Sequence, residues 1–217
     1  DDLCLPGLFR RCVEIFDAAP PSVVIVFPQT EIVDEQRRPL TQHFLPEPLD
    51  CRWPAAHRRL AQVLRHATMV RPQFGVIRTS ALQQTRLYRP MIAADFVLIA
   101  ELALLGEFWE VPEKLFQRRL HPGISTLAHR TNAERARWWD SSRRHYRRAM
   151  PPMLRVGLEY LRSIHRLPLR PSEKLRCYAT ALGVWNVRQL RNTVGRWRHR
   201  AMTPQATVLT GHAPASS

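Results

Sequence analysis

Acidic and imidazole side chains at three places in the chain could do chemistry. Asp1 and Asp2 open the chain, Asp95 begins an apolar stretch, and His121 lies in a His-Pro-Gly sequence. Carboxylate oxygens are the ligands that Mg²⁺ prefers, and an imidazole nitrogen is an acceptable ligand for Mn²⁺. Each group also has a simpler explanation. Acidic residues at a chain end are usually solvated, Asp95 can cap a helix by accepting backbone N–H bonds, and His-Pro-Gly commonly forms a turn.

The elements that would position these side chains alternate between helices and strands. Apolar residues at helical spacing predict helices over residues 8–16, 55–66 and 95–105, the last stopped by Gly106 at its C′ position. Short β-rich runs predict strands over residues 22–27, 73–79, 108–111 and 115–120, the last two separated by a turn at Pro112. A polar loop or hairpin is expected over residues 30–40 and an irregular loop over residues 41–54. This alternation predicts an α/β fold.

The chain divides into three parts by charge and pattern. Residues 1–130 hold 16 Lys+Arg against 14 Asp+Glu, whereas residues 131–200 hold 17 against 4. Residues 131–200 show helical patterns alone, so we expect a basic helical extension there. Residues 201–217 carry no charged side chain and are expected to be a disordered end.

Several classes of protein are excluded by composition. The four cysteines form no CxxC pair, so neither a disulfide framework nor a zinc site is expected, and we predict reduced thiols in a cytosolic protein. The longest apolar stretch, residues 91–106, is shorter than the roughly 18 residues of a membrane span. Within it Glu101 is expected on the helix surface, as is Glu107 just after it. Gly75 is expected to allow close packing in a strand, and Trp109 to lie in the core.

Three segments in matching order resemble the C-terminal portion of family 2 glycosyltransferases, which have the GT-A fold. They are DDLCLPGLFRRCVEIFDAAPPSVVIVFPQT, FGVIRTSALQQTRL and AADFVLIAELALLGEFWEVPEKLFQRRLHPGIS. The resemblance spans residues 1–126 and depends on the order and spacing of the segments. It implies a partial GT-A (Rossmann-like) domain over residues 1–130, followed by the α-helical C-terminal extension. The chain then begins inside the metal-binding motif, with its nucleotide-binding half absent.

The resemblance also implies roles for the acidic residues. Asp1, and with it Asp2, matches the end of the Asp-rich motif that binds a divalent cation, Mg²⁺ or Mn²⁺, on the donor diphosphate. Asp95 matches the family's catalytic base, which removes the proton from the acceptor hydroxyl. The sequence departs from the family at Ala94, where Glu is common, so acceptor contacts made by that Glu are in doubt.

Further residues receive roles in the same way. His121 matches a histidine that completes the metal or diphosphate site, and Arg118 and Arg119 just before it could contact phosphate. Phe74 and Arg78 are expected to line or support the acceptor pocket. The implied reaction is inverting transfer of a sugar from a nucleotide-sugar donor to a sugar or lipid-linked acceptor. The rival hypothesis is a non-catalytic fragment or a basic interaction module, and the fragment alone is expected to be inactive.

The basic extension has three interpretations. Arginines with interleaved aromatic residues could bind nucleic acid, but no nucleic-acid motif is found. An amphipathic basic surface also suits anionic lipid headgroups, which would place a cytoplasmic enzyme at the inner membrane face. The third interpretation is a solvated arginine face that covers the catalytic domain.

Overall fold

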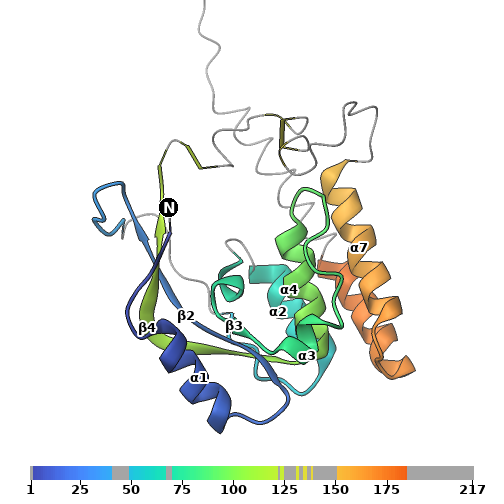
Figure 1. The fold of residues 1–217 in the computed structure, drawn as a ribbon. Helices are drawn as coiled ribbons and strands as arrows, with labels where there is room; N and C mark the ends of the chain where they lie inside the picture. Colours follow the sequence, from blue (N-terminus) through green and yellow to red (C-terminus); the bar gives the residue numbers. More distant parts are fainter. Residues whose placement is uncertain are drawn as a thin grey trace, which may run out of the picture.

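The computed structural model describes most of the chain as far as residue 184. The described residues are 2–40, 49–66, 70–121, 123–124, 131, 134–135, 138 and 151–184. Asp1, most of the segment 125–150 and the predicted disordered end at 201–217 lie outside them. Helices and strands alternate along the first part of the chain and helices follow, which confirms the α/β class (Figure 1).

A four-stranded mixed sheet forms the centre of the molecule (Figure 1). Its strand order is β1-β4-β2-β3. The long strands β2 (Val23–Val33) and β4 (Glu107–Arg119) run parallel. The short strands β1 (Leu3–Cys4) and β3 (Val76–Ile77) pair antiparallel with β4 and β2. The parallel pair brings the C-terminal ends of β2 and β4 to one edge of the fold.

The two long strands reach further than the sequence predicts. β2 continues through Pro28 to Val33 before the chain turns at Asp34, and β4 is a single strand instead of two. The predicted turn at Pro112 is therefore wrong. The pairing shifts register between Pro28 and Thr30, opposite the stretch around Pro112. Irregular pairing of this kind accommodates prolines, which cannot donate a ladder hydrogen bond.

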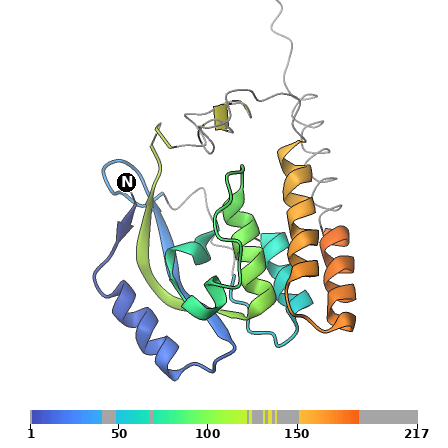
Figure 2. The ribbon, with the colours of Figure 1, turned by 45° about the vertical axis from the view of Figure 1, so that its right-hand side comes forward.

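Helices cover both faces of the sheet (Figure 2). α1 (Leu8–Ala18) packs on one face, where Leu8 and Cys12 share a core cluster with Val26 and Phe116. α2 (Ala56–His66) and α4 (Ala94–Leu105) pack on the other face. All three helices were predicted from apolar spacing. Coverage on both sides explains why every side chain from residue 23 to residue 27 is buried.

Two glycines permit close approach of the backbone to β2. A Cβ atom on Gly75 would lie 2.3 Å from the Val26 carbonyl oxygen, which confirms the expected role in packing. Gly106 follows α4 as predicted, but its φ of −170° is extended instead of left-handed. Its requirement is steric, since a Cβ there would lie 2.4 Å from the Ser22 carbonyl oxygen.

The connection that contains Gly75 differs from the strand predicted over residues 73–79. It consists of the 3₁₀ helix η1 (Arg71–Phe74), the two residues of β3, and the single-turn helix α3 (Thr79–Leu82). Pro72 lies at the start of η1, where its fixed φ suits a helical turn. The chain therefore touches the sheet edge only briefly before it turns toward α4.

The helical extension packs against the α/β part. α7 (Pro152–Arg166) lies along α4, and a second helix occupies residues 171–184 after the turn that contains Pro168 (Figure 1). Tyr160, Ile164 and Cys177 belong to the same core cluster as Phe27 and Leu98. α4 therefore lies between the sheet and α7, and it is buried on nearly all sides.

The four cysteines are free thiols, of which Cys4 is exposed and the others are buried. Burial raises the pKa of the Cys51 and Cys177 thiols to about 12. Burial also raises the pKa of Cys12 to about 11. The three buried thiols are thus held in their protonated, unreactive form.

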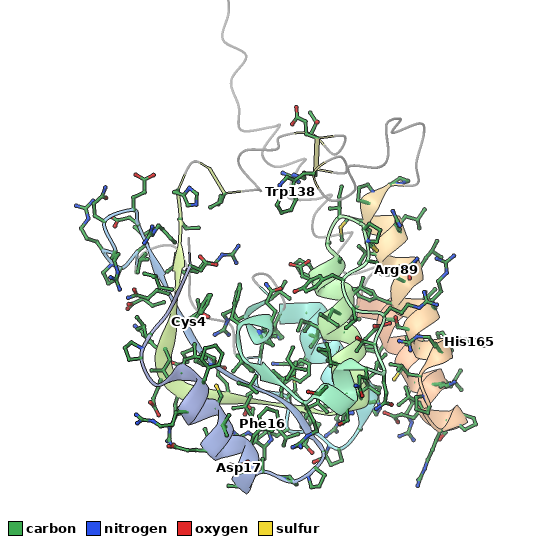
Figure 3. All side chains as sticks on the ribbon, viewed as in Figure 1. Cys4, Phe16, Asp17, Arg89, Trp138 and His165 are labelled. Atoms are coloured by element: carbon green, nitrogen blue, oxygen red, sulfur yellow. The ribbon has the colours of Figure 1, made fainter. Side chains whose placement is uncertain are left out.

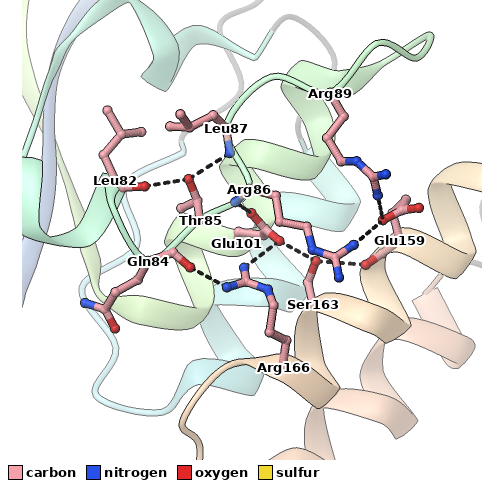
Figure 4. A network of polar contacts seen from close by, with 10 residues as sticks. All are labelled: Leu82, Gln84, Thr85, Arg86, Leu87, Arg89, Glu101, Glu159, Ser163 and Arg166. Carbon is pink, nitrogen blue, oxygen red and sulfur yellow. Dashed lines mark hydrogen bonds and ion pairs between the residues drawn. The ribbon is translucent and has the colours of Figure 1, made fainter.

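A buried carboxylate joins α4 to α7 (Figure 4). Glu101 is fully buried, so the prediction that it lies on the helix surface is wrong. One of its carboxylate oxygens accepts hydrogen bonds from Ser163 Oγ at 2.7 Å and from the Arg166 guanidinium at 2.9 Å. The other accepts the Arg86 backbone N–H at 2.8 Å. These donors compensate the loss of water around the charge.

A second buried carboxylate, Glu159 on α7, lies beside the first. Arg89 donates to one Glu159 oxygen at 2.9 Å, Arg86 contacts the same oxygen at 3.3 Å, and Arg162 donates to the other at 2.8 Å. The two carboxylates together hold the segment 83–93, which leads into α4, against both helices (Figure 4). We call this group of contacts the Glu101–Glu159 network.

Replacing Glu101 by Gln should destabilise the fold strongly. All three partners of Glu101 are donors, so an amide NH₂ would face a donor and Arg166 would lose its counter-charge. Breaking a buried pair costs on the order of 3–5 kcal/mol. Urea unfolding of the variant measures this free energy.

The matched control is Glu113→Gln. Glu113 forms an ion pair of similar length, 2.7 Å to Arg11, but both side chains are 44% exposed. Its loss should cost under about 1 kcal/mol. Equal destabilisation by the two variants would contradict the structural role of Glu101.

Candidate functional site

Asp95 lies in the first turn of α4, at the end of the helix that faces the same side as the C-terminal end of β4 (Figure 1). The residue before the helix is Ala93, with a left-handed φ of 62°, and no side chain caps it. Asp95 Oδ1 accepts the Phe96 backbone N–H at 3.0 Å. Asp95 is thus inside the helix, instead of at the cap position, but it still accepts a free N–H of the first turn.

The surroundings of Asp95 make it a stronger base than an ordinary aspartate. Burial raises the pKa of its carboxyl, and this outweighs the backbone N–H bonds and the positive charge of Arg118, which lower it. A carboxylate with a raised pKa holds a proton more readily, which is the property that a general base requires.

One residue that the sequence did not single out, Tyr88, lies near Asp95. The Tyr88 hydroxyl donates to Gln73 Oε1 at 2.6 Å. The pKa of Tyr88 is raised by burial and then by the negative charge of Asp95. Tyr88 is nevertheless 51% exposed, so its ring is accessible beside the carboxylate. The signal for Tyr88 was its place in the segment just before Asp95, but only the fold shows that it turns back toward the acid.

Arg118 connects Asp95 with the end of β4. Its charge acts on Asp95, although the two residues come from different elements. Successive side chains along a strand point to opposite faces, so we expect Arg119 to lie on the other face. The Nε atom of Arg119 is buried without a hydrogen-bond partner. The two neighbouring arginines therefore have different surroundings, and of the two only the charge of Arg118 lowers the pKa of Asp95.

The start of the chain lies beside the end of β4. β1 pairs with β4 so that Leu3 is opposite Gln117. The exposed Asp2 accepts the Arg119 backbone N–H through Oδ1 at 3.0 Å. His121 follows two residues later, and its Nδ1 accepts the Gly123 N–H at 3.2 Å. Asp2 and His121, 119 positions apart in the sequence, are thus brought to the same end of the sheet.

The side chains at this end of the sheet provide only some of the ligands that a divalent cation would need. A carboxylate on Asp2 and an imidazole on His121 are acceptable ligands. Asp1, to which the resemblance assigns the cation, lies outside the described residues. Within the described ranges, no three His, Cys, Asp or Glu side chains gather as metal ligands would. Binding of Mg²⁺ or Mn²⁺ stays a prediction.

Phe74 and Arg78 have partners on the α1 side of the sheet. Phe74 stacks on Phe116, with 4.2 Å between ring centroids. Arg78 donates from Nε to the Val23 carbonyl at 3.1 Å, and its guanidinium lies 4.9 Å from the centre of the Phe16 ring. These contacts stabilise the sheet edge, and a role of either residue in binding an acceptor stays a prediction.

The other end of β4 holds Trp109. It is partly buried, its indole N–H donates to Glu107 at 3.2 Å, and the Arg52 guanidinium covers its ring at 4.3 Å. Glu107 begins β4 and accepts a hydrogen bond from Ser22 Oγ at 3.0 Å, so the prediction that it lies on a helix surface is wrong.

The candidate site thus consists of Asp95, Tyr88, Arg118 and the Asp2–His121 end of the sheet.

The titration of Asp95 should show its unusual surroundings directly. The side-chain carboxyl signal followed by carbon NMR should give a pKa above the ordinary 3.8. Arg118→Gln should raise this pKa further, because it removes a positive charge that favours the ionised form. Arg119→Gln is the matched control and should leave the titration unchanged. A pKa at or below 3.8, or equal shifts in both variants, would refute this electrostatic description.

Comparison with known proteins neither names nor excludes a family. No protein-family model matches the chain, and no curated protein matches it either. No helix among the described residues is long and apolar enough to cross a bilayer. The function must therefore be argued from the placement of Asp95, Arg118, Asp2 and His121.

Proposed function

We propose that this chain is the acceptor-binding and catalytic part of a nucleotide-sugar-dependent glycosyltransferase of family 2, with the GT-A fold. The observation that carries the proposal is the partly buried Asp95 carboxylate. Its pKa is raised, and it lies at the start of α4 beside the end of β4. The residues matched to the family's diphosphate site, Asp2, Arg118 and His121, come to that same end of the sheet.

The reaction is a single displacement with inversion at the anomeric carbon. The Asp95 carboxylate accepts the proton of the acceptor hydroxyl while that oxygen forms a bond to the anomeric carbon. The bond from the anomeric carbon to the diphosphate oxygen breaks at the same time, and the electron pair leaves with the nucleoside diphosphate. The positive charge of Arg118 would stabilise the negative charge that develops on the departing diphosphate.

The environment of Asp95 keeps its carboxyl group ionised before the transfer and basic enough to accept the proton. The ionised form is kept available by the Phe96 N–H and by Arg118, while burial keeps the carboxylate basic. Tyr88 is the exposed aromatic residue beside it, and its ring and hydroxyl offer a surface for a sugar acceptor.

The proposal also assigns a cation and a location. Asp1 and His121, with Asp2 beside them, would hold Mg²⁺ or Mn²⁺, which supplies charge neutralisation for the departing diphosphate. Donor binding belongs to the nucleotide-binding half of the family's fold, so the activity test uses the protein with that half. The protein would act in the cytoplasm on a sugar or lipid-linked acceptor.

The Asp95→Asn variant tests the assignment of the base. We expect nucleoside diphosphate release from a panel of UDP-, GDP- and dTDP-sugars to fall by about 10²- to 10⁴-fold, the usual contribution of a general base. Asp17→Asn is the matched control, because Asp17 is exposed on α1, far from the site (Figure 3). Wild-type turnover in Asp95→Asn would refute the proposal.

The melting temperature separates lost chemistry from lost folding. Because the folded-state pKa of Asp95 lies above its unfolded value, the stability linked to its protonated form is lost as the pH rises through that pKa. An Asn side chain carries no charge to desolvate. Asp95→Asn should therefore melt at a higher temperature than the natural chain at pH 7, while its activity is lost.

A further inference from the structure

The helical extension carries an exposed apolar face that the proposed transfer reaction does not use. Leu154, Leu158 and Leu161 are spaced four and three residues apart on α7, so they share one side of that helix. Leu175 and Leu182 are one heptad apart on the helix at 171–184. Leu175 is 71% exposed and Leu182 49%. We call these five leucines the hairpin face.

A shallow apolar hollow lies within the hairpin face. Its volume is about 160 Å³, and it is lined by Leu154, Gly157, Leu158, Leu161, Ala181 and Leu182, with Tyr160. Gly157, which has no side chain, and Ala181, which has only a methyl group, line the hollow between the two helices. His165, four residues after Leu161, points outward on the same side of α7 (Figure 3). The hairpin face therefore turns away from the sheet and the core.

Positive charge flanks the hairpin face. Arg155 adjoins Leu154 on α7, and Leu175 lies between Lys174 and Arg176 on the second helix. Residues 151–200 contain 11 Lys+Arg and two Asp+Glu.

The two acidic residues in this stretch, Glu159 and Glu173, both have partners within the protein. Glu159 is bound by arginines of the Glu101–Glu159 network. Glu173 accepts the His57 N–H at 2.8 Å from the start of α2. Arg162 and Arg166 are paired with Glu159 and Glu101, so the positive charge beside the hairpin face is attributed to Arg155 and Lys174.

We propose that the hairpin face binds the surface of an anionic lipid bilayer. Leucine side chains would enter the boundary between headgroups and acyl chains, and Arg155 and Lys174, with their long apolar stems, would reach the phosphates. Charge decides against two other occupants. Residues 185–200 carry five Arg and no acidic residue, so this part of the chain would be repelled. A second copy would bring its own arginines against the same arginines.

The test is co-sedimentation of the full chain with phosphatidylcholine vesicles, with and without anionic phosphatidylglycerol. We expect binding to the anionic vesicles, weakening as salt is added, and little binding to the neutral ones. Leu154→Ser and Leu175→Ser should each weaken binding to the anionic vesicles at least about threefold, because each removes an inserted apolar side chain without changing the charge. The matched control is Phe9→Ser, since Phe9 is 62% exposed on α1 and should contribute nothing.

Three outcomes would overturn the inference. One is the absence of binding to anionic vesicles, and another is binding that both leucine variants retain in full. The third is a dimer, detected by analytical ultracentrifugation, that Leu154→Ser dissociates, which would assign the hairpin face to a second copy. Circular dichroism melts of the variants verify that they are folded. The outcome is independent of glycosyl transfer, because no step of the test requires donor or acceptor.

Discussion

Two carboxylates withdrawn from water, Glu101 and Glu159, set the arrangement of the half of the molecule that carries Asp95. Neither charge is stable in the interior without donors on every side. The donors come from two separate stretches of chain, the segment 83–93 and α7. Satisfying the two charges therefore fixes where these stretches lie relative to α4. The segment that carries Tyr88 is held at one end by this network and at the other by the start of α4.

Asp95 depends on the same arrangement in a less direct way. A helix N-terminus and a nearby arginine both favour an ionised aspartate, yet the pKa of Asp95 is raised because burial is the largest influence. α4, which carries Asp95, is covered by the sheet on one side and by α7 on the other. The packing of α4 therefore determines where the proposed catalytic group lies.

The sequence predicted the elements whose signal is local. The run from Ser22 to Phe27 is continuously apolar and β-branched, and it is indeed a strand buried on both faces. The apolar helix ahead of Gly106 was predicted almost to the residue. Asp95 was singled out only because a resemblance supported it, since its spacing alone fits a helix start equally well.

The errors have one physical origin, which is that a residue's partners can be distant in sequence. Glu101 looks like a surface residue until Ser163 and Arg166, more than 60 positions later, supply its donors. Pro112 looks like a turn until β2 is placed beside it with a matching irregularity. Gly106 satisfies a local rule for helix ends, but the contact that requires it is with Ser22 on another element. Tyr88 comes near Asp95 only because the chain between them is folded back.

The distribution of the thiols gives the molecule a single natural attachment point. Three cysteines are buried with raised pKa values, whereas Cys4 is exposed on β1, opposite Phe116 and two residues from Asp2. A maleimide dye or spin label would therefore attach beside the Asp2–His121 end of the sheet without any engineered cysteine. Such a label would report on cations or nucleotides that arrive at that end, in the natural sequence.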